Sequence, residues 1–586
     1  MCNVTSVEDS RLQQLWASHQ SPDTASEAAD FAAAFRLAHS ATLWGVPSVQ
    51  VATALARSAV NRTLAVPSAA LNTMIYNPDP LETNDQGSQI GPQDPNFMHS
   101  FAWLDLTAGA QVLSLPDMGG RFYEVYLVDV YNEIPFISSL DSSGARAPSG
   151  AFSYIITAQS DSNDANAPAA GLTFVSSSNL LWAISKVHVK AGNATDLAAA
   201  RALQQGITVK PAASNVTKPP ASAPASPAED LFRRAAAAAA QPYTLWGADR
   251  GPYTSKRDPN PVGMPKHIYK NTSAFWELLG AVSALSPPQD PAQAAFYASY
   301  SGIGLSTASS GFDPNNLTDS TILGMNMGLA AGLACVARTT QSRQQATQTS
   351  TRWQPLSGTA SYGHDYLSRA VGAMSALAME PASMSASFVS TLGTDRNEFG
   401  RGEALDGSLR NFTLAFPQAP EASAGWSLSA YNRAGMLFAT PLISGSTRGR
   451  RFSTISSDSP GLNVSSGSFS IYISATPPTQ DSPLHAHWLP IGLEPFHLVL
   501  RLYLPSGSVQ QGVYSPPPVY AYRGPPQNMS QIQDVTAMTE VLSFSTRSAY
   551  GAASAASAAK AASAVHAQSV DNSRAVHEAH IAENAR

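Results

Sequence analysis

The chain has 586 residues, enough for two or more domains of ordinary size, each with its own core. Only 13% of the residues are charged and the net charge is −6, so the sequence offers no basic surface for a nucleic acid or an anionic membrane. Its two cysteines, Cys2 and Cys335, cannot form a disulfide framework or a cysteine metal cluster. We expect a buried Cys335 and a flexible Cys2.

Export and membrane signals are not visible in the sequence. No run of about 18 apolar residues exists, so no membrane span is expected. Residues 1–20 lack a charged segment followed by an apolar one, so no signal peptide is visible.

The N-terminal 75 residues form a predicted helical segment. Thr24 and Glu27 have the spacing of a capping box, and apolar residues then recur at helical spacing. Pro47 is expected to end this helix, and a second helix is expected over 49–60. The following stretch, 77–96, is rich in Gly, Pro and Asn, and loops of this length are often functional.

Residues 76–207 carry short β-type runs separated by turn residues, which predict a first antiparallel β-sandwich. The run from Phe122 to Tyr131 is apolar on both faces and indicates a central strand covered on each side. Glu124 and Asp129 interrupt it. Because burying an unpaired carboxylate costs several kcal/mol, roughly, both must be paired or reach solvent.

Composition divides the rest of the chain. Residues 208–241 are rich in Pro, Ala and Ser, which is typical of a linker, and 242–360 are mainly helical in pattern. Residues 361–545 begin with a helix and then alternate cleanly, which predicts a second antiparallel sandwich. Residues 546–586 form an Ala/Ser-rich tail without an apolar stripe, expected to be flexible.

The run 496–504 shows the clearest alternation in the chain. Phe496, Leu498, Leu500, Leu502 and Leu504 share one face, and polar or smaller residues share the other. This is the period of a half-buried antiparallel strand. A slip of one residue would expose five large apolar side chains at about 1.5–3 kcal/mol each, so the register is strongly fixed.

Several separated motifs, in order along the chain, resemble a known family. The segments QDPNFMHSFAWLDL and RFYEVYLVDVYNE match its first half, and the matching residues are Ser100, Trp103, Asp105, Leu106, Arg121, Asp129 and Tyr131. Its second half is matched by Gly363, Asp365, Tyr366, Arg369, Ala370, Asp406, Gly407, Trp426, Ser427, Leu428, Tyr431, Trp488, Leu489, Pro490, Arg501, Tyr503 and Pro505. The chain is thus similar to tandem proteins with domains of unknown function 1254 and 1214.

The resemblance implies a fold and leaves the activity open. It implies two antiparallel jelly-roll-like sandwiches with N-terminal and central helical regions, a mainly β protein without a cofactor. Folds of this kind often form homo-oligomers such as trimers. The chain departs from the family pattern at Asn96, His99 and His487, so any site that relatives build there is altered.

Local motifs give only weak candidates for chemistry. His485 and His487 form an H-x-H pair that would place two imidazoles on one face of a strand, a weak metal candidate beside the simpler interpretation of hydrogen-bonded histidines. Nucleophile-elbow, zincin, redox, Walker and dinucleotide motifs are missing. A catalytic triad or carboxylate pair depends on three-dimensional geometry, so no catalytic residue is assigned.

The candidate pocket or motif residues come from the family-like segments. They are Asn96, His99, Asp105, Arg121, Asp129, Trp426, Tyr431, Trp488, Arg501 and Tyr503. Asp105 and Asp129 are expected to pair with Arg121 or to cap turns. Aromatic residues near the strands, including Trp103 and Tyr131, either pack in the core or offer stacking platforms for a carbohydrate.

Nine N-x-S/T sequons favour an extracellular or cell-surface glycoprotein. They begin at Asn3, Asn61, Asn193, Asn215, Asn271, Asn316, Asn411, Asn463 and Asn528. Our leading hypothesis is a secreted or surface glycoprotein with a binding or structural role, assembled as an oligomer. The alternative is an extracellular hydrolase of esters or glycans, with its site between the two sandwiches near the 77–96 loop.

Overall fold

The computed structural model describes most of the chain between residues 25 and 522. The larger gaps are 61–70, 81–93, 140–149, 160–171, 213–271 apart from Ala228 and Leu231, and 441–450. Nearly all described residues belong to one compact unit, 1–480 with 485–523. The predicted C-terminal tail and the sequons at Asn3, Asn61, Asn215, Asn271, Asn463 and Asn528 lie outside the described residues.

Helices form one layer of this unit. They are α2 (Ala25–Val60), α6 (Thr272–Leu285), α7 (Pro291–Ala298), the 3-10 helix η4 (Ser299–Ile303), α8 (Asp319–Ala346) and α9 (Tyr366–Ser375). The prediction that Pro47 ends a helix is wrong, because α2 is continuous and contains it. An internal proline costs about 3 kcal/mol, whereas each fully buried large apolar side chain stabilises by about 1.5–3 kcal/mol. Trp44, Val46, Val49 and Leu55 are all fully buried.

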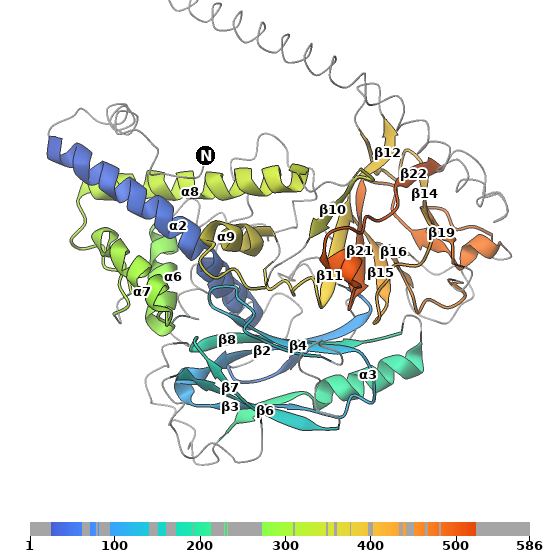
Figure 1. The fold of residues 1–586 in the computed structure, drawn as a ribbon, viewed down its shortest axis with the longest axis horizontal. Coiled ribbons are helices and arrows are strands. Elements are labelled where there is room, and N and C mark those ends of the chain that lie inside the picture. The colour runs from blue at the N-terminus through green and yellow to red at the C-terminus, as the bar shows by residue number, and fades with distance from the viewer. Residues whose placement is uncertain are drawn as a thin grey trace, which may run out of the picture. The chain divides into compact units, whose positions relative to one another are not determined.

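The helices α2 and α8 run side by side (Figure 1). Their close approach depends on Gly324, Gly328 and Gly332, spaced four residues apart on α8. A Cβ atom at Gly328 would lie 2.5 Å from the carbonyl oxygen of Phe35 on α2. Glycine therefore lets the two backbones touch.

Helix α8 is apolar enough to be compared with a membrane span. Its segment Asp319–Arg343 is long and apolar enough to cross a membrane by length and composition, but about half of its most apolar part is buried within the protein, as in the core helix of a soluble protein. Cys335 on this helix is buried, as expected. It is disulfide-bonded, so the expected thiol is not free. The other cysteine of the sequence, Cys2, lies outside the described residues.

The first sandwich consists of two sheets (Figure 1). One has the order β1 (Ile75–Tyr76), β2 (Phe97–Asp105), β8 (Leu180–His188), β4 (Tyr123–Asp129), β5 (Phe136–Ser139). The other has the order β7 (Leu172–Ser176), β6 (Phe152–Ala158), β3 (Gln111–Leu115), β9 (Thr208–Pro211). The 3-10 helix η2 (Leu106–Ala108) and the helix α3 (Ala194–Gly206) complete this part. Pairing of β9 with β3 extends strand structure into the first residues of the predicted linker.

The sheet that contains β4 is covered on both faces, as predicted for this strand. Val125 and Leu127 point into the core between the two sheets. Tyr126 and Val128 point the other way, into a core shared with the helices. The strand is buried along its whole length because neither face meets solvent.

The second sandwich also has two main sheets. Their orders are β10 (Trp353–Leu356), β11 (Ser385–Ser390), β21 (Phe496–Tyr503), β15 (Trp426–Asn432), β18 (Thr454–Ser456), and β20 (Trp488–Pro490), β19 (Phe469–Ser474), β14 (Asn411–Phe416), β22 (Val519–Tyr522). Smaller elements are β12 (Leu392–Arg396), β13 (Gly402–Ala404), β16 (Ala439–Thr440), β17 (Arg451–Phe452), η5 (Pro483–His485) and α10 (Gly507–Gln510).

Strand β21 confirms the predicted alternation but is not half-buried. Phe496, Leu498, Leu500 and Leu502 point into the sandwich core. The opposite face is buried as well, because it packs on residues of the first sandwich, so the expected solvent-facing side is wrong. Leu504 leaves the strand with a φ of 47° and joins a different cluster.

The fold class agrees with the sequence prediction in outline. Among the described residues, 34% are helical and 33% lie in strands, so this part of the protein is a mixture of helices and mostly antiparallel sheets, and the mainly β prediction holds only roughly. The pairs β6–β7 and β19–β20 are parallel. The finer jelly-roll topology stays a prediction.

Candidate functional site

A row of polar side chains crosses the first sandwich on the face that points away from its core. His99 on β2 is opposite Lys186 on β8, and Lys186 is opposite Glu124 on β4. Directly opposite residues of neighbouring strands share a face and lie close together. The row lies between an aromatic cluster of Phe97 and Phe122 and the apolar core shared with the helices.

A second polar face belongs to the second sandwich. On β21 and β15, Arg501 is opposite Ser427 and His497 is opposite Tyr431. The guanidinium of Arg501 donates to the Tyr431 hydroxyl at 3.0 Å, and the His497 ring stacks on Tyr431 at 5.4 Å. All four side chains are buried, so this face forms an internal surface of the protein.

Asp94 joins the two polar faces. It lies just before β2, and its Oδ1 accepts hydrogen bonds from the backbone and side-chain amides of Asn96 at 3.0 Å. Its Oδ2 lies 3.3 Å from the Ser427 hydroxyl and 3.9 Å from Nε of Arg501. The Ser427 hydroxyl also bonds to the Tyr503 hydroxyl at 2.8 Å. Asp94 thereby contributes to a site that is built from both halves of the chain.

Lys186 is the second point of contact between the halves. Its Nζ contacts Oε1 of Glu380, in the segment between α9 and β11, and lies 3.6 Å from Oε2 of Glu124. The Glu380 segment is held in place because the backbone N–H of Ala378 donates to Oδ1 of Asn132, just after β4, at 2.8 Å. The two carboxylates flank one ammonium group in a mostly buried position.

We call Lys186, Glu124 and Glu380, together with the neighbouring His99, Asp94 and Arg501, the Lys186 cluster. Burial shifts the pKa of several of these groups. Burial raises the pKa of Glu124, and Lys186 only partly offsets the effect. Burial lowers the pKa of Lys186, against the opposing effect of Glu124 and Asp94. His99 and His497 each have a pKa lowered to about 4, mainly by burial, so both rings are neutral near pH 7.

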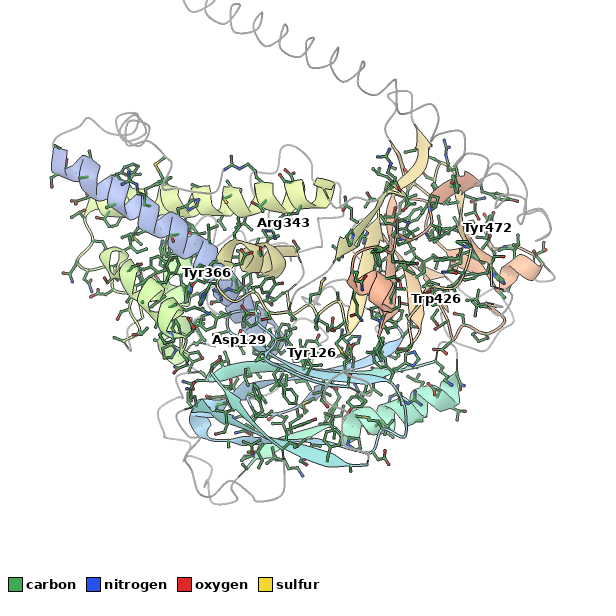
Figure 2. The ribbon with its side chains drawn as sticks, viewed as in Figure 1. Tyr126, Asp129, Arg343, Tyr366, Trp426 and Tyr472 are labelled. Atoms are coloured by element: carbon green, nitrogen blue, oxygen red, sulfur yellow. The ribbon has the colours of Figure 1, made fainter. Side chains whose placement is uncertain are left out.

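A second buried cation lies where α9 meets the first sandwich. Arg369 is fully buried, 3.7 Å from Oε1 of Glu133, and its guanidinium lies 5.1–5.9 Å from the ring centroids of Tyr366, Tyr131 and Trp44. Asp129, whose carboxylate also interacts with this cation, has a pKa raised to about 7 by burial. We call this the Arg369 cluster; Figure 2 labels Tyr366 and Asp129, one from each half.

The candidate residues separate into two groups. Asn96, His99, Tyr431, Arg501 and Tyr503 meet in or beside the Lys186 cluster. Asp105, Arg121, Asp129, Trp426 and Trp488 have local partners of their own.

The aspartates cap turns, as one of the two predicted roles requires. Asp105 accepts from the backbone N–H of Thr107, and Asp129 accepts from those of Tyr131 and Glu133. The other predicted role, pairing with Arg121, is not observed. Arg121 instead forms a bidentate ion pair with Asp196 at the start of α3, at 2.7 and 2.9 Å.

The aromatic candidates are core residues. Trp426 stacks on Phe416 and Phe469, and Figure 2 shows it within the second sandwich. Trp488 donates its indole N–H to the Ser474 carbonyl. Trp103, Trp426, Trp488, Tyr131, Tyr431 and Tyr503 are all at least 93% buried, so none of them is a stacking platform on the surface.

The histidine pair does not form a metal centre within the described part of the chain. His487 is buried with Nδ1 3.0 Å from the Ser470 carbonyl, and His485 is oriented toward the Pro478 carbonyl at 3.5 Å. Among the residues that the structure describes, no three or more His, Cys, Asp or Glu side chains form a group suited to a metal.

Sequence reasoning missed Asp94, Lys186 and Glu380. Lys186 did carry a signal, since it is the only charged residue within the apolar run 180–187. Glu124 carried another, and the prediction that it must be paired or reach solvent is confirmed, because its Oε2 lies 3.6 Å from Nζ of Lys186. Glu380 carried none, because only the tertiary structure brings its segment to β8.

Comparison with known proteins identifies both halves of the chain. Residues 71–211 match the model of a protein of unknown function, DUF1254, and residues 394–507 match that of DUF1214. The chain is a tandem DUF1254–DUF1214 protein. The Lys186 cluster of this DUF1254–DUF1214 protein therefore takes Lys186 and Glu124 from the first domain and Arg501 from the second.

The fold resembles that of a solved structure at low sequence identity. The VPA0106 protein from Vibrio parahaemolyticus is 17% identical, with a TM-score of 0.56, and the match covers 84% of this chain and all of that one. An uncharacterised protein from Burkholderia cenocepacia is 10% identical, with a TM-score of 0.33, over 88% of this chain and 98% of that one. No curated protein matches this chain.

Proposed function

We propose that this DUF1254–DUF1214 protein is a secreted or cell-surface glycoprotein with a binding or structural role. The observation that carries the proposal is the position of two sequons. Asn193 and Asn316 are both exposed, at the start of α3 and in the loop before α8. Asn193 uses only its Oδ1 to cap α3, by accepting from the N–H of Asp196 at 3.0 Å. This geometry is compatible with a glycan on Nδ2.

A third sequon has the opposite geometry and provides a control. Asn411 is partly buried at the start of β14, and its Nδ2 donates to the Tyr472 hydroxyl at 3.0 Å. A glycan on this atom would replace that hydrogen bond. We therefore expect Asn193 and Asn316 to carry glycans and Asn411 to remain unmodified.

The disulfide at Cys335 supports the same compartment. Disulfides persist in oxidising compartments and are rare in the reducing cytosol. We therefore place the protein outside the cell or on its surface, without a cofactor.

The structural role includes self-association, with a trimer among the oligomers expected for jelly-roll domains. Strand β7 lies at the edge of its sheet in the described residues and exposes Leu172 and Val175, at 52% and 44%. An exposed apolar edge strand is open to pairing with another chain. A second copy of the protein would cover this edge.

Glycosidase treatment of the protein from a eukaryotic secretory host tests the localisation. We expect Asn193→Gln and Asn316→Gln each to remove one step of the glycosidase-sensitive mobility shift, whereas Asn411→Gln leaves it unchanged. A protein that is retained in the cell without glycans would contradict the proposal.

Light scattering tests self-association. We expect a mass above that of one chain, reduced by Val175→Lys on β7 but unaffected by Val513→Lys, a control at an exposed apolar residue outside the strand. A monomeric unsubstituted protein would exclude this part of the proposal.

A hydrolase of esters or glycans is the second candidate, favoured by one observation. The Ser427 hydroxyl lies between Asp94 and Tyr503, where both halves of the chain meet. Because Ser427 is fully buried, a substrate would require local opening. Turnover of chromogenic esters or glycosides that is lost in Ser427→Ala would support it, and absence of turnover in the unsubstituted protein would exclude it for those substrates.

A further inference from the structure

Lys186 is placed between two carboxyl groups from opposite halves of the chain. Its Nζ contacts Oε1 of Glu380 on one side and lies 3.6 Å from Oε2 of Glu124 on the other. The ring centroid of Tyr126 lies 5.5 Å from the same nitrogen. These groups are the components of an amide-forming reaction. The amine of Lys186 and the carboxyl group of Glu380 could form the amide, and the second carboxyl group, that of Glu124, could transfer protons.

The surroundings of these groups exclude most of the solvent. Glu124 is 1% exposed and Glu380 8%, and the side chain of Lys186 is 15% exposed. Oε1 of Glu124 is buried and has no hydrogen-bond partner among the described residues. A buried carboxyl oxygen without a hydrogen-bond partner is available to hold a proton and to pass it on.

Burial also favours the neutral forms that the reaction requires. It lowers the pKa of the Lys186 amine and raises that of the Glu124 carboxyl. A desolvated amine gives up its proton more readily and becomes a nucleophile, and a carboxyl group with a raised pKa holds its proton more firmly and can donate it within the site. The rigid β8 strand and the anchored Glu380 segment hold amine and carboxyl in contact, which replaces a collision between separate molecules.

We propose that Lys186 and Glu380 form an intramolecular isopeptide bond, with Glu124 as the proton carrier. The neutral Nζ attacks Cδ of the protonated Glu380 carboxyl and forms a tetrahedral centre. Glu124 donates its proton to the leaving hydroxyl, which departs as water, and takes one proton from Nζ. The C–O bond breaks, the C–N bond remains, and Glu124 regains its starting state. The products are one amide and one water, and no oxidant or co-reactant is needed.

The bond would connect two segments 194 residues apart in the sequence. It would join β8 of the DUF1254 half to the segment that leads into β11 of the second sandwich. A covalent connection of this kind suits a protein outside the cell, where repair and refolding by chaperones are missing. It is independent of whether the protein also has a catalytic activity.

Intact mass spectrometry of the full chain, after deglycosylation and reduction, tests the bond. We expect a mass lower than that of the sequence by one water molecule. Proteolytic digestion should then release one branched peptide that joins the segment containing Lys186 to the segment containing Glu380. A mass equal to that of the sequence would overturn the proposal, and so would a branch between any other pair of side chains.

Variants test the role of each group. Lys186→Arg and Glu380→Ala should restore the full mass, and Lys190→Arg, a nearby lysine outside the cluster, should retain the loss of water. Glu124→Gln keeps the size of the side chain but cannot carry the proton, so the unlinked fraction should rise from near zero to most of the protein. Complete bond formation in Glu124→Gln would overturn the assignment of Glu124. The measurement on the unsubstituted chain remains decisive where a variant fails to fold.

Discussion

Two of the buried cations that connect the halves of the protein, Arg369 and Lys186, have different surroundings. Arg369 is enclosed by the rings of Trp44, Tyr131 and Tyr366, and Oε1 of Glu133 lies 3.7 Å away. Lys186 is flanked by Glu124 and Glu380 with one aromatic ring beside it. One cation interacts mainly with ring faces, and the other mainly with carboxyl groups.

The difference follows from the chemistry of the two side chains. A guanidinium is always charged and stacks well on aromatic rings, so Arg369 is suited to permanent packing. An ammonium group loses its proton more readily when it is buried, so Lys186 can react. The comparison teaches that the two clusters differ in the cation: the Arg369 guanidinium packs on rings and stabilises the fold, whereas the Lys186 amine touches the carboxyl group with which we propose that it reacts.

The largest expected effect is that of Arg369→Ala. Removal of this cation leaves Glu133 without its partner and opens a cavity between three rings, so we expect the free energy of unfolding to fall by about 3–5 kcal/mol. Urea unfolding followed by tryptophan fluorescence measures it. Arg343→Ala on α8 is the control: the Arg343 side chain makes an exposed hydrogen bond to Ser368, so its loss should change stability by less than about 0.5 kcal/mol. If Arg369→Ala and Arg343→Ala lower the free energy of unfolding equally, the contacts of Arg369 with the three rings do not add to stability.

Asp129→Asn, in the Arg369 cluster, should change how the free energy of unfolding depends on pH. The pKa of Asp129 is about 7 in the folded protein and 3.8 ordinarily, so the folded state holds a proton that the unfolded state has lost between these values. Stability therefore falls as the pH rises from about 4 to 7. Asparagine keeps an oxygen for the two backbone N–H groups but cannot ionise, so this fall should shrink by about 2–4 kcal/mol.

Denaturant midpoints at several pH values measure this change. Asp117→Asn, at an exposed turn-capping aspartate, is the matched control. If Asp129→Asn and the unsubstituted protein show parallel profiles between pH 4 and 7, Asp129 is not the titrating group.

His497 lies beside the Lys186 cluster, and its titration should affect the free energy of unfolding in the opposite direction to that of Asp129. His497→Phe tests this. The pKa of His497 is lowered to about 4 by burial, so between pH 6.5 and 4 the unfolded state binds a proton that the folded state does not. Stability is therefore lost as the pH falls through this window. Phenylalanine can keep the stacking on Tyr431 and cannot titrate, so the loss should shrink by about 2 kcal/mol. A profile that changes above pH 7 instead would assign the titration to another group.

The strands were largely predictable from local patterns. The predicted central strand within 122–131 is β4, Tyr123–Asp129, and the predicted strand 496–504 is β21 to within one residue. Side chains of a strand alternate between two faces, and this period can be read from the sequence. The continuity of α2 through Pro47 could not be predicted, because it depends on what buries the helix.

The candidate site was predictable only in part. Tyr431, Arg501 and Tyr503 were found through family-like motifs, and the need to pair Glu124 followed from its position in an apolar strand. Glu380 was not found, because it is 194 residues from Lys186 and its own neighbourhood has no unusual pattern.

By itself, the sequence determined where the strands lie, which side chains share a face, and that two β-rich halves follow each other along the chain. These features depend on interactions between residues that are near in sequence. Only the tertiary structure decided that the polar face of β21 meets the first sandwich and that one lysine lies between carboxyl groups from both halves. Such contacts join distant segments, and their free energy depends on the packing of the whole unit rather than on any local pattern.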